Sequence, residues 1–393
     1  MQDNEKKPAL RFKGFTDPWE QRKFEEIAVR SSVMSDKKGL PRVEYEDIIS
    51  GAGRLNKDIK LKESEKVGIV FHKGDVLYGK LRPYLQNWLL ASFNGLAVGD
   101  FWVLQPQNTD SSFLYRLVQS QQFDGVANQS TGTKMPRADW KLVSKTKFAM
   151  PHSVDEQAAI GAYFEHLDTL ITLHQRKYEK LVNIKKSMLD KMFPQNGASV
   201  PEIRFKGFTD PWEQRKLGDI TVELSEYATQ ELGLPLLTSS RSGLMYQDEY
   251  RDSRTTKSTE TLFSVVPVGT CTYRHMSDDD VFHMNINTLE KGLVSREYPV
   301  FEASKGNNLE FLVQHINSSE EFKAFCAEQK KGGTRTRLYY NTLCQFTVRV
   351  PALKEQAQIS QCLKKLDTLI TLHQRKLEKL QNIKKSCLEK MFV

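Results

Sequence analysis

The sequence lacks the usual features of membrane, secreted and metal-cluster proteins. No apolar run approaches the roughly 18 residues that a membrane-spanning helix needs, and the first residues contain no hydrophobic stretch like that of a signal peptide. The five cysteines are odd in number, lie in the second half of the chain, and are never spaced as C-x-x-C. This pattern argues against a disulfide framework or a zinc cluster and favours reduced thiols. We therefore expect a globular protein of the cytoplasm, with no membrane partner.

A large excess of charge of one sign is also absent. The chain has 393 residues with 57 Lys+Arg and 49 Asp+Glu, a formal net charge of +8. This length predicts about two or three domains, and the charge is compatible with a polyanionic partner. Residues 1–154 carry a formal charge of +6, whereas residues 204–353 carry −2. Nucleic-acid binding by the second region would therefore depend on local basic clusters.

Two segments of the sequence occur twice. Arg11–Lys23 recurs without change as Arg204–Lys216, at an offset of 193 residues. Leu167–Phe193 recurs as Leu366–Phe392, at an offset of 199 and with four differences. A repeat of this length predicts two copies of one structural unit.

Short matching anchors persist between these repeated blocks. Gly95–Val103 parallels Gly292–Val300, and Gly132-Thr133 parallels Gly333-Thr334, at offsets of 197 and 201. The remaining sequence of the two copies differs. We therefore interpret the copies as one fold that carries two different surfaces.

The pattern within each copy predicts a mixed α+β domain followed by a long helix. Residues 24–150 and 217–350 contain short apolar runs broken by Gly, Asn, Ser and Pro, which is typical of strands. Pro151 and Pro351 then precede uninterrupted helical patterns, the first from about Asp155 to Phe193. The predicted segments are a domain at 1–150, a helix at 151–193, a linker at 194–203, a domain at 204–350 and a helix at 351–393.

Both predicted helices carry apolar residues at alternating steps of four and three, which is a heptad seam. We expect the two helices to pair as an antiparallel coiled coil with internal pseudo-twofold symmetry and one domain at each end. His174 and His373 lie near the helix midpoints and should approach each other. They either fix the helix alignment or form a contact sensitive to pH or metal. The seam consists of Ile160, Phe164, Leu167, Ile171, His174, Tyr178 and Leu181, and of Ile359, Leu363, Leu366, Ile370, His373, Leu377 and Leu380.

Motifs that resemble catalytic or metal sites fail on inspection. Gly74–Lys80 has nearly the spacing of a phosphate-binding loop, but Leu81 stands where Ser or Thr is required. Asp17-Pro18-Trp19 has a single proline and no Gly-rich cofactor loop upstream, so we interpret it as a turn. Asp278–Asp280 has no second block of ligands at a suitable spacing, which favours a solvated acidic loop over a metal site. The sequence predicts no catalytic residue and no bound metal.

Local basic clusters are the best candidates for DNA binding. Both copies place Arg and Lys around a Gly-Thr pair, and the first also has basic residues near Pro83. Loops that mix Arg or Lys with polar residues hold phosphates and present donors and acceptors to base edges, although ordinary solvated loops have the same composition. The candidate residues are Lys80, Arg82, Asn128, Gln129, Lys134, Arg137, Arg274, Lys331, Arg335 and Arg337.

Three motifs carry a family resemblance that covers the whole chain. They are the repeated Pro-Trp-Glu-Gln-Arg-Lys block, which continues as Leu-Gly-Asp-Ile at Pro211–Ile220, the helix starts Glu156-Gln157 and Glu355-Gln356, and Gly74-Asp-Val-Leu followed by Leu81-Arg82-Pro83. With these motifs the chain resembles the DNA-specificity (S) subunit of Type I restriction-modification systems. The first copy departs from the pattern at Phe24–Ile27.

The resemblance implies a division of labour. Each variable region would be a target recognition domain for one half of a split DNA site, and the helix pair would set the spacing. Two methyltransferase (M) subunits, which use S-adenosylmethionine, would dock on the helices, and restriction (R) subunits would bring ATP and Mg²⁺ chemistry. The chain itself would be non-catalytic and bind no cofactor. A coiled-coil scaffold without a DNA role and a stand-alone DNA-modifying enzyme are the alternatives.

Overall fold

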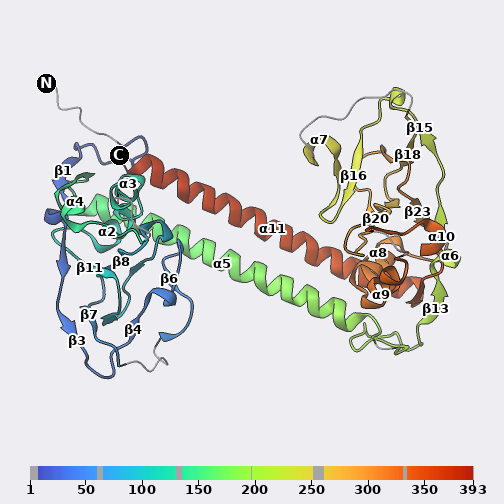
Figure 1. Ribbon diagram of the computed structural model, residues 1–393, viewed down its shortest axis with the longest axis horizontal. Coiled ribbons are helices and arrows are strands. Elements are labelled where there is room, and N and C mark those ends of the chain that lie inside the picture. Colours follow the sequence, from blue (N-terminus) through green and yellow to red (C-terminus); the bar gives the residue numbers. More distant parts are fainter. Residues whose placement is uncertain are drawn as a thin grey trace. The chain divides into compact units, whose positions relative to one another are not determined.

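The computed structural model describes residues 8–59, 65–129, 135–195, 197–250, 261–330 and 334–392 (Figure 1). It contains helices and sheets in each of two compact units, as the α+β interpretation requires. Unit 1 comprises residues 1–177 and 373–393, and unit 2 comprises residues 178–372. The boundary crosses two helices of 39 residues each, α5 (Val154–Met192) and α11 (Leu353–Met391). The units therefore differ from the linear segments predicted from the sequence, because each takes a part of both helices.

Outside the long helices, unit 1 consists of short strands with helices between them. Its elements are β1 (Glu20–Lys23), α1 (Phe24–Ile27), β2 (Ala28–Ser31), β3 (Met34–Ser35), β4 (Arg42–Val43), η1 (Tyr45–Asp47), β5 (Ile48–Ile49), β6 (Arg54–Leu55), β7 (Gly68–Phe71), β8 (Val76–Gly79), η3 (Pro83–Leu85), β9 (Trp88–Leu90), β10 (Gly95–Ala97), β11 (Phe101–Pro106), α2 (Ser111–Leu117), α3 (Gln121–Ala127), α4 (Trp140–Lys145) and β12 (Lys147–Met150).

A sheet of order β2-β11-β8-β9 forms the centre of unit 1, and all of its pairings are antiparallel. Successive side chains of a strand point to opposite faces. Val76 and Tyr78 of β8 accordingly enter the core beneath the helices, whereas Leu77 enters a second core with residues of the sheet β3-β7-β10-β4. Because both faces are buried, the strand has a continuous apolar run rather than polar alternation.

Unit 2 repeats this plan with different residues. Its elements outside the long helices are β13 (Glu213–Lys216), α6 (Leu217–Ile220), β14 (Thr221–Glu223), β15 (Tyr227–Ala228), η4 (Gln230–Leu232), β16 (Leu237–Ser240), β17 (Gly243–Tyr246), α7 (Gln247–Tyr250), β18 (Phe263–Val266), β19 (Cys271–Thr272), β20 (Met276–Ser277), β21 (Asn285–Ile286), β22 (Gly292–Ser295), β23 (Val300–Ala303), α8 (Leu309–Ser318), α9 (Glu320–Glu328), β24 (Thr336–Arg337), α10 (Tyr340–Leu343) and β25 (Thr347–Val350).

The strand order of unit 2 matches that of unit 1. Its central sheet is β14-β23-β19-β21, and its strands correspond one by one to β2-β11-β8-β9. Phe301 of β23 enters the core beneath the helices, and its neighbour Val300 enters the second core. The pairings β1 with β12 and β13 with β25 have equivalent registers. Two unrelated variable sequences therefore build the same sheet.

The residues of the repeated blocks hold each other in both units. Arg11 donates two hydrogen bonds to the buried carboxylate of Glu156, with N–O distances of 2.6 and 2.8 Å. Arg204 makes the same bidentate contact with Glu355, at 2.7 and 2.8 Å. Trp19 also donates from its indole nitrogen to Glu156 at 3.3 Å. The repeat is therefore a structural frame that fixes the start of each long helix against its domain.

The glutamine next to each of these glutamates serves the same purpose. The side-chain oxygen of Gln157 accepts from the backbone N–H of Asp110 at 2.9 Å, and its amide donates to the carbonyl of Pro151 at 2.9 Å. Gln356 makes the equivalent contacts in unit 2 with the N–H of Asn308 and the carbonyl of Pro351. Asp110 and Asn308 in turn cap helices α2 and α8. Each Glu-Gln pair thus joins the long helix to a short one.

The ends of the predicted seam lie inside the domain cores. Ile160, Phe164 and Leu167 are buried in the unit 1 core together with Met391 and Phe392. In unit 2 the buried cluster contains Ile359 and Leu363 with Met192 and Phe193, and the partly buried Leu366 packs against it. In each unit the start of one long helix therefore packs beside the end of the other.

The central seam residues are less buried than those at the ends, because only the two helices shield these side chains from solvent. Ile171 and His174 are half-buried in unit 1, with His373 and Leu380 of the second helix. In unit 2, Leu181 and Ile370 are also half-buried. Leu173, Leu369 and Leu372 lie exposed on the helices.

Candidate nucleic-acid interface

Unit 1 brings three of the predicted DNA-binding residues together. The segment that follows β8 pairs with the segment before α4 through the antiparallel bridge between Leu81 and Arg137. The N–H of Arg82 donates to Pro136 at 2.7 Å, and the N–H of Ala138 donates to the carbonyl of Lys80 at 2.8 Å. Arg137 is therefore a neighbour of Lys80 and Arg82, although it lies more than 50 residues further along the chain.

The close packing around Gly79 positions this bridge. A Cβ atom at Gly79 would lie 2.5 Å from the hydroxyl oxygen of Tyr45. That hydroxyl donates to the carbonyl of Leu81 and accepts from its N–H, both at 2.8 Å. Burial raises the pKa of Tyr45, so the hydroxyl stays protonated. The glycine that resembled part of a phosphate-binding loop is instead a strand residue that makes room for a tyrosine.

A carboxylate lies between two of the basic side chains. Asp100 accepts from Lys80 at 3.4 Å and from Arg137 at 3.1 Å. Burial opposes ionisation of Asp100, but the hydrogen bond and charge of Arg137, with Lys80, hold its pKa below the ordinary value. Arg82 is half-buried in a left-handed conformation with φ of 49°, and its Nε has no hydrogen-bond partner within the described residues.

The polar candidates of unit 1 lie at the end of α3, which packs beside η3. The side-chain amide of Asn128 donates to the carbonyl and carboxylate of Asp124, at 2.9 and 3.0 Å, so this side chain already closes the helix end. Gln129 is exposed. Lys134, with the Gly132-Thr133 pair, lies outside the described residues.

Unit 2 forms the same bridge from different residues. β20 and β24 pair antiparallel with Met276 opposite Arg337, as Leu81 lies opposite Arg137 in unit 1. The N–H of Leu338 donates to the carbonyl of His275 at 2.8 Å, the counterpart of the bond from Ala138 to Lys80. Arg337 and Arg137 therefore occupy equivalent places in the two units.

The environment of His275 links Arg274 and Arg337. His275 is buried, and its ring stacks on Tyr339 with centroids 5.7 Å apart. Burial lowers the pKa of His275, and the nearby charges of Arg337 and Arg274 lower it further, against an opposing effect of Glu297. A neutral imidazole thus lies near two exposed arginines.

The acidic triplet Asp278–Asp280 is not a loop that faces only solvent, as the sequence analysis expected. Asp278 accepts from Nε of Arg335 at 2.7 Å, and Asp279 forms an ion pair with Arg241. Asp280 lies 3.6 Å from Nζ of Lys330 and accepts a hydrogen bond from Thr336. The β20–β24 pairing causes this difference, because it brings acidic and basic segments together.

Sequence reasoning missed two partners of the basic cluster, Asp100 and Arg241, and the pairing role of Asp278–Asp280. Asp100 lies in the short motif Gly95–Val103 that both copies share, and this repetition could have marked it as a candidate. No comparable pattern marks Arg241, which lies at the turn between β16 and β17. Lys331 lies outside the described residues, and across the described ranges no group of three or more His, Cys, Asp or Glu could hold a metal ion.

The predicted approach of the two helix histidines occurs within unit 1. The Nδ1 atoms of His174 and His373 are 2.8 Å apart. One ring must donate and the other accept, so the contact needs at least one unprotonated nitrogen. Burial lowers the pKa of His174, and the charges of His373, Lys376 and Lys177 lower it further.

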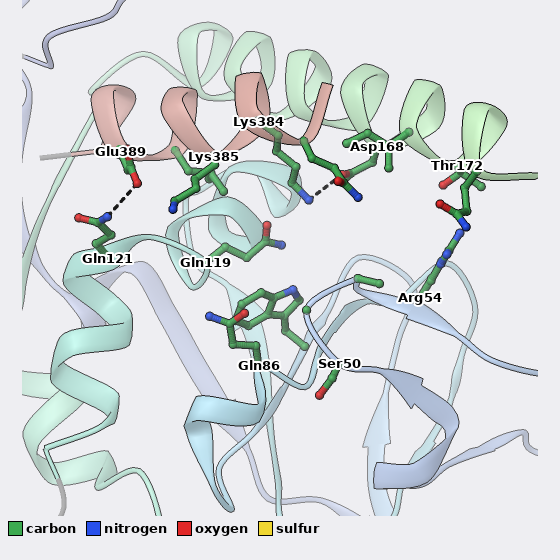
Figure 2. A pocket seen from close by; sticks show the side chains of 17 residues that line it. Ser50, Arg54, Gln86, Gln119, Gln121, Asp168, Thr172, Lys384, Lys385 and Glu389 are labelled. Carbon is green, nitrogen blue, oxygen red and sulfur yellow. Dashed lines mark hydrogen bonds and ion pairs between the residues drawn. The ribbon is translucent and has the colours of Figure 1, made fainter. Parts of the chain in front are cut away.

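A cavity of about 650 Å³ lies in unit 1 between the variable region and the two helices (Figure 2). On its helix side Asp168 forms ion pairs with Lys384 at 2.6 Å and with Arg116 at 2.7 Å. Gln121 of α3 donates to Glu389 of α11 at 3.2 Å. These contacts tie the domain to both helices.

The chain matches the family model for the Type I restriction modification DNA specificity domain at residues 16–183 and 283–382, which together are more than half of the sequence. The chain belongs to this family, and the resemblance in its motifs is confirmed. Among the described residues, no helix has the length and apolar character required to cross a bilayer.

The chain is also similar to individual proteins. The Type I restriction enzyme EcoDI specificity subunit of Escherichia coli is 25% identical over 127 residues, which are 31% of this chain and 28% of that protein. The match thus spans less than a third of the curated relative. The S subunit of a Type I restriction-modification system from M. genitalium shares the fold, with a TM-score of 0.62 at 12% identity over 98% of this chain and 99% of that one. The HsdS subunit from Thermoanaerobacter tengcongensis is 18% identical over 97% and 98% of the two chains, with a TM-score of 0.45.

Proposed function

We propose that this chain is the sequence-specific DNA-binding subunit of a Type I restriction-modification complex. Each globular region is a target recognition domain that reads one half of a bipartite DNA site. The chain directs methyltransferase and restriction subunits to that site in the cytoplasm, and it performs no catalysis itself. Family membership supports the DNA-specificity role.

One observation carries the proposal of two separate readers. Each unit forms the same antiparallel bridge, Leu81 with Arg137 and Met276 with Arg337, and surrounds it with different polar and basic side chains. A constant frame with variable side chains is what two readers of different half-sites require. Bidentate contacts of arginine with guanine edges are each worth about 1–3 kcal/mol of discrimination.

The long helices have a spacing role in this proposal. We infer that α5 and α11 pair as an antiparallel coiled coil about an internal pseudo-twofold axis, and that this pair sets the gap between half-sites. A fixed spacer gives two modest readers a high effective concentration on a correctly spaced site. The exposed Leu173, Leu369 and Leu372 offer apolar surface for two M subunits.

The cofactors of the complex belong to its partners in this proposal. The M subunits use S-adenosylmethionine to methylate adenine, and the R subunits use ATP and Mg²⁺. This chain holds none of these groups. Its own residues bind double-stranded DNA and position the partners.

Methylome mapping tests the proposal. N6-methyladenine is mapped in cells that express the M subunit with the native chain, with no chain, or with a chimera in which a relative supplies residues 24–150. We expect methylation at one bipartite motif that depends on the chain, and a change in one half-site only in the chimera. An unchanged motif, or a change in both half-sites, would contradict independent reading.

A second experiment tests the spacing role. Insertion of about one helical turn into α5, between residues that face solvent, should lengthen the gap of the methylated motif or abolish methylation. Methylation at an unaltered gap would remove the spacer from the proposal. The scaffold and the stand-alone enzyme are not favoured, because the family is one of DNA-specificity domains.

A further inference from the structure

Several of the candidate DNA-binding cations already have a carboxylate partner. In unit 1, Asp100 pairs with both Lys80 and Arg137. In unit 2, Arg335 pairs with Asp278. Two unrelated variable sequences thus place a carboxylate at the basic side chains beside the same backbone bridge.

Unit 2 extends this pairing to a small network. Arg241, from the turn between β16 and β17, pairs with Asp279, and Lys330, which follows α9, pairs with Asp280. Three cations from three separate segments therefore converge on three consecutive aspartates, Asp278–Asp280.

The backbone holds these aspartates in place. β20 ends at Ser277, directly before the triplet, and pairs with β24, directly after Arg335. The hydroxyl of Ser277 donates to Asp279 at 2.9 Å, and Asp280 has a φ of 63°, a left-handed conformation that aspartate tolerates better than most residues. The acidic turn is therefore a built feature rather than a set of free surface side chains.

The ion pairs are exposed enough to exchange with another anion. The side chains of Arg335 and Asp278 are 53% and 68% exposed, and those of Arg241 and Asp279 are 62% and 48% exposed. Pairs of this kind contribute little to folding. Replacement of the carboxylates of Asp278 and Asp279 by DNA phosphates should therefore cost the fold little.

We propose that Asp100 and the Asp278–Asp280 turn are intramolecular competitors of DNA phosphates that suppress binding to DNA without the recognition site. This inference rests on the proposed DNA-binding function. On site-free DNA, affinity comes almost entirely from cations that neutralise phosphates. Each cation that must first leave a carboxylate adds less to that affinity. At a matching half-site, base contacts supply additional free energy that site-free DNA cannot.

The double variant D278N/D279N tests the proposal in the full-length chain. Asparagine keeps the size and one acceptor oxygen of each side chain, and Asp280 stays intact. The probe is a fluorescein-labelled 30-base-pair duplex that lacks the mapped motif, titrated by anisotropy at several NaCl concentrations. A native thermal midpoint verifies folding.

Freed cations should strengthen binding to the site-free duplex. The expected gain is about two- to thirty-fold, the range set by two exposed ion pairs. The slope of log K against log salt should become steeper by up to about 0.9 for each of Arg335 and Arg241. D100N, which releases Lys80 and Arg137, should act in the same direction from unit 1.

The control is E202Q/E226Q, which removes two carboxylates from the exposed pairs with Lys191 and Lys291 in unit 2. It changes the net charge equally but leaves the bridge untouched, so its salt slope should stay close to that of the native chain. Equal gains in the control and in D278N/D279N would overturn the proposal, since net charge alone would then explain them. An unchanged affinity in D278N/D279N and D100N would also overturn it.

Methylation by the native chain distinguishes a failure of this inference from a failure of the proposed function. If the native chain with its M subunit methylates no bipartite motif, the DNA-specificity function itself fails. If it methylates such a motif and the aspartate variants behave like E202Q/E226Q, only the competitor role fails.

Discussion

The ion pair between Arg11 and Glu156 provides a sharp test of how the repeated blocks stabilise the domains. The perturbation is Glu156→Gln, which keeps the shape of the side chain and removes its charge. Arg11 then loses its bidentate partner while its own side chain is only 16% exposed. The variant therefore leaves a largely buried cation without its carboxylate, while its hydrogen bond to the carbonyl of Asp17 remains.

The structure sets the expected magnitude. Removing one partner of a buried ion pair costs about 3–5 kcal/mol. The residual exposure of Arg11 lets some water reach the guanidinium, so we expect a loss of about 2–3 kcal/mol in the free energy of unfolding. Glu355→Gln in unit 2 is an internal replicate, because Arg204 and Glu355 have nearly the same distances and exposure. The Trp19 contact should make the loss at Glu156 larger by about 1 kcal/mol, since Nε1 of Trp212 has no hydrogen-bond partner among the described residues.

Urea unfolding followed by tryptophan fluorescence measures these losses. Four of the five tryptophans lie in residues 1–177 and report on unit 1, and Trp212 reports on unit 2. Glu25→Gln is the matched control, because its pair with Lys145 is exposed and should contribute less than about 1 kcal/mol. A double-mutant cycle with Arg11→Met isolates the pair. A coupling energy below about 0.5 kcal/mol would refute the idea that the repeated blocks clamp the helix starts.

Three further predictions follow from local contacts. Burial lowers the pKa of His315 to about 4, below the value near 6.5 in the unfolded chain, so the folded state favours the neutral ring and loses stability as the pH falls. The free energy of unfolding of unit 2 should therefore decrease by about 3 kcal/mol between pH 7 and pH 4. His315→Leu should remove this loss in urea titrations at both pH values. Burial lowers the pKa of His174 as well, so acidification should weaken its contact with His373 and raise hydrogen exchange at the helix midpoints. Replacing both histidines with Leu should abolish this acid-dependent rise, and a rise that persists would disprove the role of the histidine contact. The N–H of Leu10 donates to the carbonyl of Lys390 at 3.0 Å, so the two ends of the chain can be joined by a short added segment. A circular permutant joined in this way and opened within residues 194–203 should keep the native fluorescence and thermal midpoint, and an insoluble permutant would contradict this.

Much of the fold could be predicted because the chain contains two copies of the same sequence blocks. Identical blocks at Arg11–Lys23 and Arg204–Lys216 indicated equivalent frames, and the structure gives both the same contact with a glutamate at the helix start. The helix patterns were also readable, since the heptad spacing is local. The division into units was not readable, because burial of Met391 and Phe392 in the first core depends on contacts more than 200 residues apart.

The candidate site was predictable in composition but not in pairing. The sequence selected Arg137 and Arg337 from basic loops, and the structure gives them equivalent places beside the backbone bridge. It interpreted Asp278–Asp280 as solvated, because nothing in the order of residues links this turn to Arg335, 57 positions later. Asn128 had the composition of a base reader, yet its amide is engaged by Asp124.

The sequence by itself determined the duplication, the two long helices and the family, and its heptad pattern predicted the residues along the helix seam. These properties depend on residue identity and on spacings of a few positions, which survive in a linear string. Only the tertiary structure decided which carboxylate meets which cation and which helix end completes which core. Such partners are chosen by strand pairing and burial between distant segments, so they exist only once the chain has folded.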